Sequence, residues 1–266
     1  MFLKIEICYN YVNLLAIKIK QLFHLFSKKP VLKDLIPDHH VDFHSHILPG
    51  IDDGAKSFEN AASLIASMKE LRFEQLIATP HVMKNVWDNT SDSITEKLQE
   101  TKVFLKKNQQ EIPLNAAAEY LMDGAFSDAL ENEKLLTLKN NYVLVEMSYI
   151  NPPIQLYDII FKIQVAGYKP VLAHPERYIF YHNNFGEYEK LKHSGCLFQI
   201  NLLSVVGYYG EEVAIAAQKL LKKGMIDFAG SDIHHHNHIN AFSKRLLLND
   251  ALPLKEALKN NEFFRL

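Results

Sequence analysis

Short apolar runs alternate with longer amphipathic stretches from residue 40 to the end of the chain. Each run spans four to six residues, and several are rich in Val, Ile and Leu, which is typical of strands buried in a parallel sheet. Seven strands are predicted in this way, over residues 41–44, 75–79, 114–119, 142–147, 170–173, 197–201 and 226–229.

Helical patterns fill the segments between the predicted strands. Ser57 precedes an Ala- and Leu-rich stretch, Ser91 precedes a helical pattern over residues 94–105, and Pro153 stands where a first helical turn tolerates proline. Another helix is predicted over residues 211–221, closed by Gly224. Strands that alternate with helices form right-handed βαβ units, so about seven such units predict an α/β fold, a (β/α)7 barrel similar to a TIM barrel.

Residues 1–38 differ from the rest and are predicted to form an N-terminal helical extension and linker, followed by one domain over residues 39–266. Lys18 and Lys20 interrupt the apolar stretch, so no uncharged run reaches the ~20 residues that a membrane-spanning helix needs. Apolar residues recur at helical spacing within residues 11–29. Two interpretations stay open: an amphipathic helix in peripheral contact with a membrane, and a helical appendage packed on the domain.

Composition and charge narrow the class of protein. Of the 266 residues, 48% are hydrophobic and 23% charged, as in soluble globular proteins. The formal net charge of −2 gives no electrostatic footprint for nucleic acid, so a nucleic-acid partner is not expected. The only cysteines are Cys8 and Cys196, which excludes a disulfide framework and a thiolate zinc site and favours a cytoplasmic location. The 13 histidines are the unusual feature.

Imidazole and carboxylate side chains stand at or near the ends of six of the seven predicted strands. In a parallel barrel the carboxyl ends of the strands surround one mouth, where active sites form. His44 and His46 lie two residues apart, so their side chains point to the same side of a strand. The nine candidates are His44, His46, Asp53, His81, Glu119, Glu146, His174, Asp232 and His234.

Nine such groups gathered in one small volume predict a metal centre. Burying carboxylates is costly unless positive charge neutralises them, and imidazole together with carboxylate suits Zn, Mn or Fe. The set exceeds the needs of one ion, so we expect two or three divalent ions that share carboxylates. Our hypothesis assigns His44, His46, Glu119 and Asp232 to one ion, Glu119, Glu146 and His174 to a second, and Asp53, His81 and His234 to a third.

The order of these motifs resembles the polymerase and histidinol phosphatase (PHP) superfamily of metal hydrolases, and within it the bacterial tyrosine phosphatases of capsule and exopolysaccharide synthesis. The matching segments are residues 41–55, 79–81, 118–120, 145–148, 174–178 and 230–234. The resemblance implies a distorted PHP-type barrel of about seven βα units, three divalent metal ions with Mn preferred over Fe or Zn, and phosphotyrosine as substrate. The partner it implies is the phosphotyrosine tail of a membrane-linked tyrosine kinase, met in the cytoplasm or at the inner face of the membrane.

The expected reaction is attack on phosphorus by a water that bound metal activates. Arg177, three residues after His174, is the expected catalytic residue, because its fork-shaped guanidinium suits a phosphate. Lys84 and Tyr178 are further candidates for substrate contacts. The chain departs from the family pattern after His81, the second-strand histidine, where Val82 stands in place of a basic residue.

Alternative functions remain compatible with the sequence. A phosphatase of a small phosphate monoester, such as histidinol phosphate, would use the same scaffold. An amidohydrolase also places H-x-H on a barrel, but Glu119, Glu146 and His234 fit a three-ion phosphoesterase better. A non-catalytic module that docks on a kinase is the third alternative. The nine polar groups argue against it, because burying them without a metal would destabilise the fold.

Overall fold

The structure is a computed structural model that describes residues 28–266. Residues Val31–Leu266 form one compact unit, distinct from Met1–Pro30. Residues 31–38, which we expected in the linker, belong to the compact unit: Leu32 and Ile36, in and just after η1 (Leu32–Leu35), are fully buried in the core. The amphipathic stretch predicted over residues 11–29 lies almost wholly outside the described residues.

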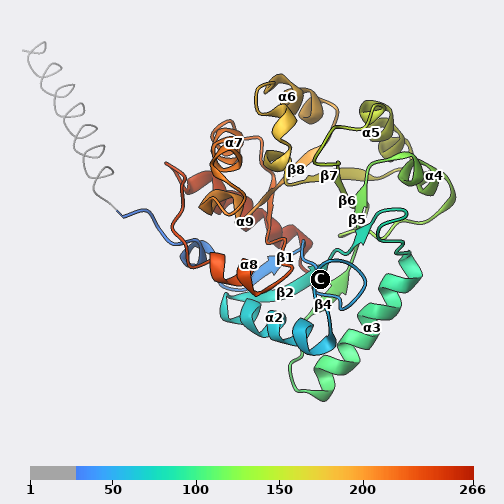
Figure 1. Ribbon diagram of the computed structural model, residues 1–266, viewed down its shortest axis with the longest axis vertical. Coiled ribbons are helices and arrows are strands. Elements are labelled where there is room, and N and C mark those ends of the chain that lie inside the picture. The colour runs from blue at the N-terminus through green and yellow to red at the C-terminus, as the bar shows by residue number, and fades with distance from the viewer. Residues whose placement is uncertain (1–27) are drawn as a thin grey trace, which may run out of the picture. The chain divides into compact units, whose positions relative to one another are not determined.

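Parallel strands form the centre of the compact unit and fall into two sheets (Figure 1). The strand order is β1-β2-β4 in the first sheet and β3-β5-β6-β7-β8-β9 in the second. The strands are β1 (His40–Asp42), β2 (Phe73–Ala78), β3 (His81–Val82), β4 (Leu114–Ala116), β5 (Glu119–Leu121), β6 (Tyr142–Glu146), β7 (Lys169–Ala173), β8 (Leu197–Asn201) and β9 (Phe228–Gly230).

Two short interruptions divide what is one barrel of seven strands. The chain runs from β2 into β3 across residues 79–80, and from β4 into β5 across residues 117–118. Hydrogen bonds continue through the interruption, because the Ala117 N–H donates to the Ala78 carbonyl at 2.8 Å and the Glu119 N–H donates to the Pro80 carbonyl at 3.1 Å. Each of the two strand pairs therefore acts as one interrupted strand, which gives seven strands in all in the described part of the chain.

The first and last strands meet just beyond their carboxyl ends and close the barrel. The Asp232 N–H donates to the His44 carbonyl at 2.8 Å, and the His46 N–H donates to the Ile233 carbonyl at 2.9 Å. Ser45 and Ile233 form a parallel bridge at the same place. The predicted distorted (β/α)7 barrel is thus confirmed, and its closing seam is made by residues adjacent to candidate metal ligands.

Within their own lengths, before this seam, β1 and β9 do not pair with each other. The side chain of Asn261 connects them instead. Asn261 is fully buried at the start of η5 (Asn261–Phe264). Its Nδ2 donates to the carbonyls of Val41 at 3.0 Å and Ala229 at 2.6 Å, and its Oδ1 accepts from the Ala229 N–H at 3.2 Å. One buried amide therefore satisfies backbone groups that would otherwise be buried without partners.

Helices cover the outside of the barrel (Figure 1). They are α2 (Phe58–Glu70), α3 (Ser91–Lys107), α4 (Gly124–Asn132), α5 (Leu156–Val165), α6 (Gly186–His193), α7 (Glu211–Lys222), α8 (His236–Ala241) and α9 (Leu252–Asn260). Short 3₁₀ turns lie between them: η2 (Pro175–Arg177), η3 (Ile179–Tyr181) and η4 (Ser204–Val206). Within residues 28–266, no helix has both the length and the apolar character that crossing a bilayer requires.

The predicted helix starts agree with the structure except at one proline. The Ser57 hydroxyl caps α2 by accepting the Asn60 N–H, and α3 begins at Ser91 with Thr90 as its cap. The helix α5 begins only at Leu156, so the prediction that Pro153 lies in its first turn is wrong. Pro153 precedes the helix and its carbonyl accepts the Leu156 N–H, because the loop that leads into α5 is longer than expected.

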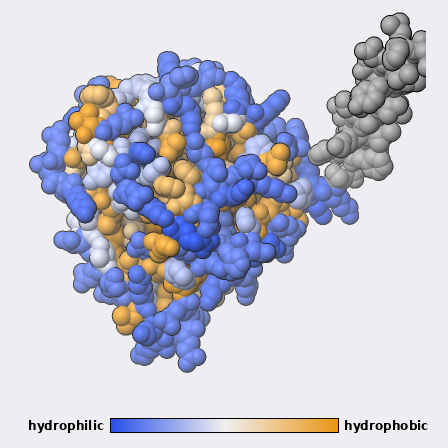
Figure 2. All heavy atoms as spheres, turned by 180° about the vertical axis from the view of Figure 1, so that it is seen from behind, coloured by the Kyte–Doolittle hydropathy of each residue, from blue (hydrophilic) through white to orange (hydrophobic). Residues whose placement is uncertain are grey.

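The surface is mostly polar, with apolar side chains reaching it in separate patches, as Figure 2 shows for the rear face. Below the surface, apolar side chains from the strands and from the inner faces of the helices form the core. This packing holds the strand ends, and hence the side chains of the mouth, in fixed positions.

Replacing Asn261 with alanine should destabilise the barrel strongly. The Asn261→Ala variant leaves two carbonyls and one N–H buried without partners, so we expect the free energy of unfolding to fall by at least about 2 kcal/mol. Urea unfolding followed by circular dichroism measures this change. Asn260→Ala is the matched control, because its exposed amide makes one hydrogen bond, to the Asp227 carbonyl. Equal stability of the two variants would contradict the closing role of Asn261.

Candidate metal centre and active site

All nine predicted ligands come together at the mouth of the barrel. Glu146 ends β6, and His44, His46, His174, Asp232 and His234 follow the carboxyl ends of β1, β7 and β9. His81 and Glu119 begin the short strands β3 and β5, just after the two interruptions, and Asp53 lies further along the loop between β1 and α2. Their ligand atoms fall into four overlapping groups, each with atoms within 4.8 Å of one another. The groups are His46, Asp53, His81 and His234; His44, His46 and Asp232; His44, Glu119 and His174; and His81, Glu119 and Glu146.

Glu119 lies at the centre of these groups and is fully buried. Its Oε2 lies 3.3 Å from His44 Nε2, 3.4 Å from His46 Nε2 and 3.3 Å from His81 Nδ1, yet makes no hydrogen bond. Two ligand atoms that each lie about 2.1 Å from one ion are about 3–3.5 Å apart. The nitrogens around Glu119 Oε2 therefore have the spacing of atoms that share a cation.

The two oxygens of Asp232 have different surroundings. Oδ1 lies 3.4 Å from the nearest nitrogens of His44, His46 and His234. Oδ2 accepts hydrogen bonds from Asn201 Nδ2 at 2.7 Å and from Arg177 Nη1 at 2.9 Å. Because two donors hold Oδ2 in place, Oδ1 is oriented toward the imidazoles and is available as a ligand atom.

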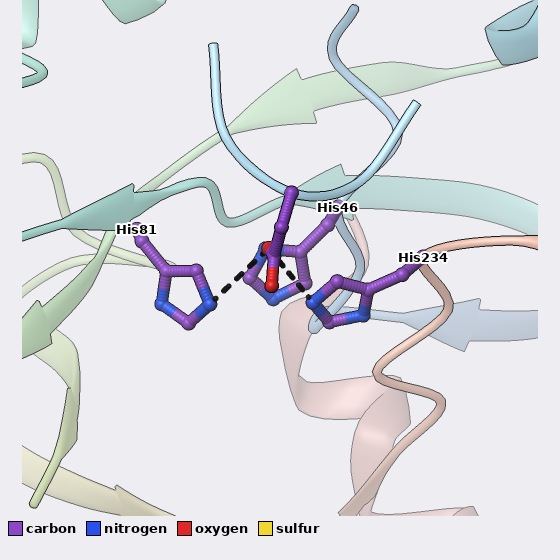
Figure 3. A group of neighbouring side chains, drawn as sticks. His46, His81 and His234 are labelled. Atoms are coloured by element: carbon purple, nitrogen blue, oxygen red, sulfur yellow. Dashed lines mark ion pairs between the residues drawn. The ribbon is translucent and has the colours of Figure 1, made fainter. Parts of the chain in front are cut away.

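Three histidines from different elements surround a further carboxylate, as Figure 3 shows for His46, His81 and His234. The carboxylate is that of Asp53, whose Oδ1 lies 3.3 Å from His234 Nε2 and 3.7 Å from His81 Nε2. Asp53, His81 and His234 are the third set that the sequence analysis proposed, and the structure adds His46 to it.

The second proposed set, Glu119, Glu146 and His174, is divided in the structure. Glu146 pairs with His81, with 2.8 Å between Glu146 Oε1 and His81 Nδ1. His174 lies instead on the side of His44, and its Nε2 is 3.1 Å from Glu119 Oε1. Glu146 and His174 thus fall into different groups that share Glu119, and their assignment to one ion stays a prediction.

Burial and close charges shift the pKa values of the site strongly. Burial disfavours a charged His81, but the carboxylates of Glu119 and Glu146 outweigh this and raise its pKa to about 9. Burial opposes ionisation of Glu119 in the same way, and the neighbouring His44 and His81 nevertheless hold its pKa well below the usual value. Nearby carboxylates also raise the pKa values of His44 and His46, so without metal, protons on these three imidazoles offset the charge of the buried carboxylates.

Supporting residues that the sequence analysis missed orient the ligand histidines. Gln199 Oε1 lies 2.7 Å from His44 Nδ1, and Asp52 Oδ2 lies 2.8 Å from His46 Nδ1, so the Nε2 atoms of both rings point into the site. Gln199 and Asn201 stand two residues apart in an otherwise apolar strand, and this spacing was the signal that could have revealed them. Gly54 lets the loop approach closely, because a Cβ there would lie 1.9 Å from the His46 carbonyl oxygen.

Arg177 lies between two aromatic rings at the edge of the site. Its guanidinium carbon is 4.6 Å from the ring centre of Tyr149 and 4.1 Å from that of Tyr209. The side chain is 20% exposed and lines a cavity of about 470 Å³ together with Glu146, His174 and Asp232. The stacked rings and the ion pair to Asp232 hold the guanidinium at the wall of this cavity.

The two other residues predicted to contact substrate, Tyr178 and Lys84, lie outside the cavity that Arg177 lines. Tyr178 is fully buried, and its hydroxyl oxygen accepts the Met147 N–H at 2.9 Å, so the prediction that it touches substrate does not hold. Its ring packs behind His174, with ring centres 5.8 Å apart, and thereby supports a candidate ligand. Lys84 lies on an exposed turn and lines a neighbouring cavity of about 370 Å³, which shares Trp87 with the site cavity.

Comparison with known proteins agrees with this arrangement. The family described as "Capsular polysaccharide synthesis, CpsB/CapC" matches residues 40–241, which is more than half of the chain. Tyrosine-protein phosphatase YwqE of Bacillus subtilis is 29% identical over 198 residues, covering 73% of this chain and 77% of the relative. Tyrosine-protein phosphatase CpsB of Streptococcus pneumoniae is 28% identical over 203 residues, covering 73% of this chain and 83% of the relative.

A solved structure extends the similarity to the fold. It comes from work on YwqE from Bacillus subtilis and CpsB from Streptococcus pneumoniae, described there as unique metal-dependent tyrosine phosphatases. It superposes with a TM-score of 0.74 at 25% sequence identity and covers 84% of this chain and 93% of that chain. The matched residues include all nine candidate ligands, and this chain is therefore a member of the CpsB/CapC family of capsular polysaccharide synthesis proteins.

Proposed function

We propose that this chain is a metal-dependent protein-tyrosine phosphatase, a phosphoric monoester hydrolase that acts on a bacterial tyrosine kinase and so regulates capsular or exopolysaccharide synthesis. The observation that carries the proposal is the convergence of imidazoles on Glu119 and Asp232 beside a cavity that contains an arginine. The tyrosine-protein phosphatases among the relatives support the same reaction class.

The proposed cofactor is a cluster of three divalent ions, with Mn preferred over Fe or Zn. The donor set fits such ions, because imidazole and carboxylate are present together and Glu119 Oε2 is buried without a hydrogen bond. The four ligand groups overlap through Glu119 and three histidines, so neighbouring ions would share ligands. When bound, the ions supply a Lewis acid that lowers the pKa of water and neutralises phosphate charge.

Residues of the cavity provide the remaining functions. The Nη1 of Arg177 donates to Asp232, which leaves the other N–H groups of the guanidinium for a phosphate oxygen. Trp87, Tyr149 and Tyr209 line the same cavity and offer apolar surface to a phenyl ring. A tyrosyl leaving group has a pKa of about 10, so its departure needs little help from a general acid.

The proposed partner is a phosphotyrosine-bearing tail of a membrane-linked tyrosine kinase. We place the enzyme in the cytoplasm, with residues 11–29 available for peripheral contact with the membrane. The membership in a capsule-synthesis family supports a kinase of that system as the substrate.

Metal binding should release protons and strengthen with pH. Each ligating imidazole must be neutral, and His81, with a pKa raised to about 9, carries a proton at neutral pH in the metal-free protein. Protons thus compete with metal at low pH, and we expect the affinity to rise between about pH 6 and about pH 9. Calorimetric titration of the full-length protein with MnCl₂, in buffers of different ionisation enthalpy, counts the released protons. A pH-independent affinity without proton release would contradict the ligand assignment.

Phosphatase activity should depend on metal and on the central carboxylate. With added Mn we expect hydrolysis of an aryl phosphate and of phosphotyrosyl peptides, and loss of activity on chelation. Glu119→Gln removes the charge that several groups share and should lower turnover by at least about 1,000-fold and reduce bound Mn. Glu100→Gln is the control, since Glu100 is an exposed partner of Lys97 on α3. Preferential hydrolysis of histidinol phosphate would support the small-ester alternative, and no turnover of any ester would indicate a non-catalytic module.

Arg177→Ala should separate catalysis from metal binding. The variant loses the phosphate-binding guanidinium but keeps all nine candidate ligands, so we expect kcat/KM for aryl phosphate to fall by about 100- to 1,000-fold. Metal content, measured by mass spectrometry of the purified protein, should stay close to that of wild type. Arg72→Ala provides a control, because Arg72 contacts Asp38 and the Ile36 carbonyl away from the cavity. Unchanged turnover in Arg177→Ala would remove the arginine from the mechanism.

A further inference from the structure

Exposed apolar side chains are concentrated in one segment beside the mouth of the barrel. Among residues 28–266, fourteen large hydrophobic side chains are exposed, and six of them fall within residues 149–165. They are Tyr149, Ile150, Ile154, Tyr157, Phe161 and Val165. This segment comprises the β6–α5 loop and the helix α5, which lies on the outside of the barrel (Figure 1). We call residues 149–157 the apolar rim.

The apolar rim is continuous with the site cavity. Tyr149 belongs to both, because its hydroxyl lies 3.4 Å from His174 Nε2 while the residue is 45% exposed. Ile150 and Ile154, which are 79% and 105% exposed, follow in the same loop and lie outside the residues that line the cavity. A polypeptide whose phosphotyrosine enters the cavity can leave it over this rim.

The loop holds these side chains outward through local structure. The Ile150 N–H donates to the Ser148 hydroxyl at 3.2 Å, and the Leu156 N–H donates to the Pro153 carbonyl at 3.1 Å. Pro152 and Pro153 restrict the backbone between them. The exposure of the two isoleucines is therefore built into the loop, which is typical of a surface that a partner covers.

The surroundings of the apolar rim favour a polypeptide over other occupants. A second copy of the chain or a flat bilayer that covered the rim would obstruct the adjoining cavity. Surfaces that bind bilayers also carry exposed Lys and Arg, whereas the basic residues next to the rim pair with acids. Arg177, against the ring of Tyr149, pairs with Asp232, and Lys162 pairs with Glu131 at 3.0 Å. Glu187 accepts the Tyr157 hydroxyl and pairs with Lys190. An extended peptide, in contrast, lies across the rim with one residue in the cavity.

We propose that the apolar rim selects substrates in which bulky aliphatic or aromatic residues flank the phosphotyrosine. This inference rests on the proposed phosphatase activity. An extended chain advances about 3.4 Å per residue, so side chains within about three residues of the phosphotyrosine reach the rim. Burial of Ile150 and Ile154 against these side chains stabilises the bound peptide without contact to the reacting phosphate.

The test compares phosphotyrosyl peptides of equal length with Leu, Glu or Lys at the flanking positions, together with p-nitrophenyl phosphate as a small ester. For the wild-type full-length protein with Mn, we expect kcat/KM to be at least about tenfold higher for the Leu peptide than for the other two. In the double variant Ile150→Ser, Ile154→Ser, this preference should disappear through a higher KM, while turnover of p-nitrophenyl phosphate stays unchanged. Ile215→Ser is the matched control, an isoleucine 57% exposed on α7.

Each outcome decides a separate point. Failure to hydrolyse p-nitrophenyl phosphate would overturn the proposed function itself. With that activity present, equal rates on the three peptides, or a preference that survives in the double variant, would overturn the apolar rim as a specificity surface. A preference for the Lys peptide would overturn it as well and point to the neighbouring cavity, where Asp88, Asp123 and Asp128 lie. A change of oligomeric state in the double variant, measured by light scattering, would show that a second copy covers the rim.

Discussion

The structure depends on one electrostatic arrangement, the fully buried carboxylate of Glu119 surrounded by the imidazoles of His44, His46, His81 and His174. An isolated carboxylate at this depth would be strongly destabilising, and positive charge from protons or metal is needed to compensate for it. Because its pKa is raised, His81 carries a proton in the metal-free protein and supplies part of that charge. Divalent ions would take its place, which couples occupancy of the site to pH.

The residues that close the barrel also build the site. The hydrogen bonds that join the first and last strands are made by the backbones of His44, His46, Asp232 and Ile233. Three of these residues also present their side chains to the candidate metal centre. The polar side chains of Gln199 and Asn201, inside the barrel, then orient His44 and Asp232. Folding of the seam therefore preorganises the site before any ion or substrate binds.

The rim of the cavity combines groups of different chemistry. Arg177, held between Tyr149 and Tyr209, stands where phosphate charge would be met, and Tyr149 connects this position to the exposed isoleucines of the β6–α5 loop. Reaction chemistry is thus proposed for the strand ends and η2, and partner selection for the neighbouring β6–α5 loop. Loops at the carboxyl ends of barrel strands can vary in this way without disturbing the barrel.

The alternation of apolar runs and helical patterns was sufficient to predict the barrel. The positions of His, Asp and Glu near strand ends were sufficient to predict that these side chains converge, because parallel strands bring their carboxyl ends to one mouth. Only the tertiary structure showed which candidates are neighbours, because it brings Glu146 to 2.8 Å from His81 and groups His174 with His44 and Glu119. The burial of Tyr178 and the pairing of Arg177 with Asp232 were likewise set by packing between distant segments. Sequence spacing determines on which face of an element a side chain lies, whereas only the three-dimensional path of the chain determines which side chain from another element it meets.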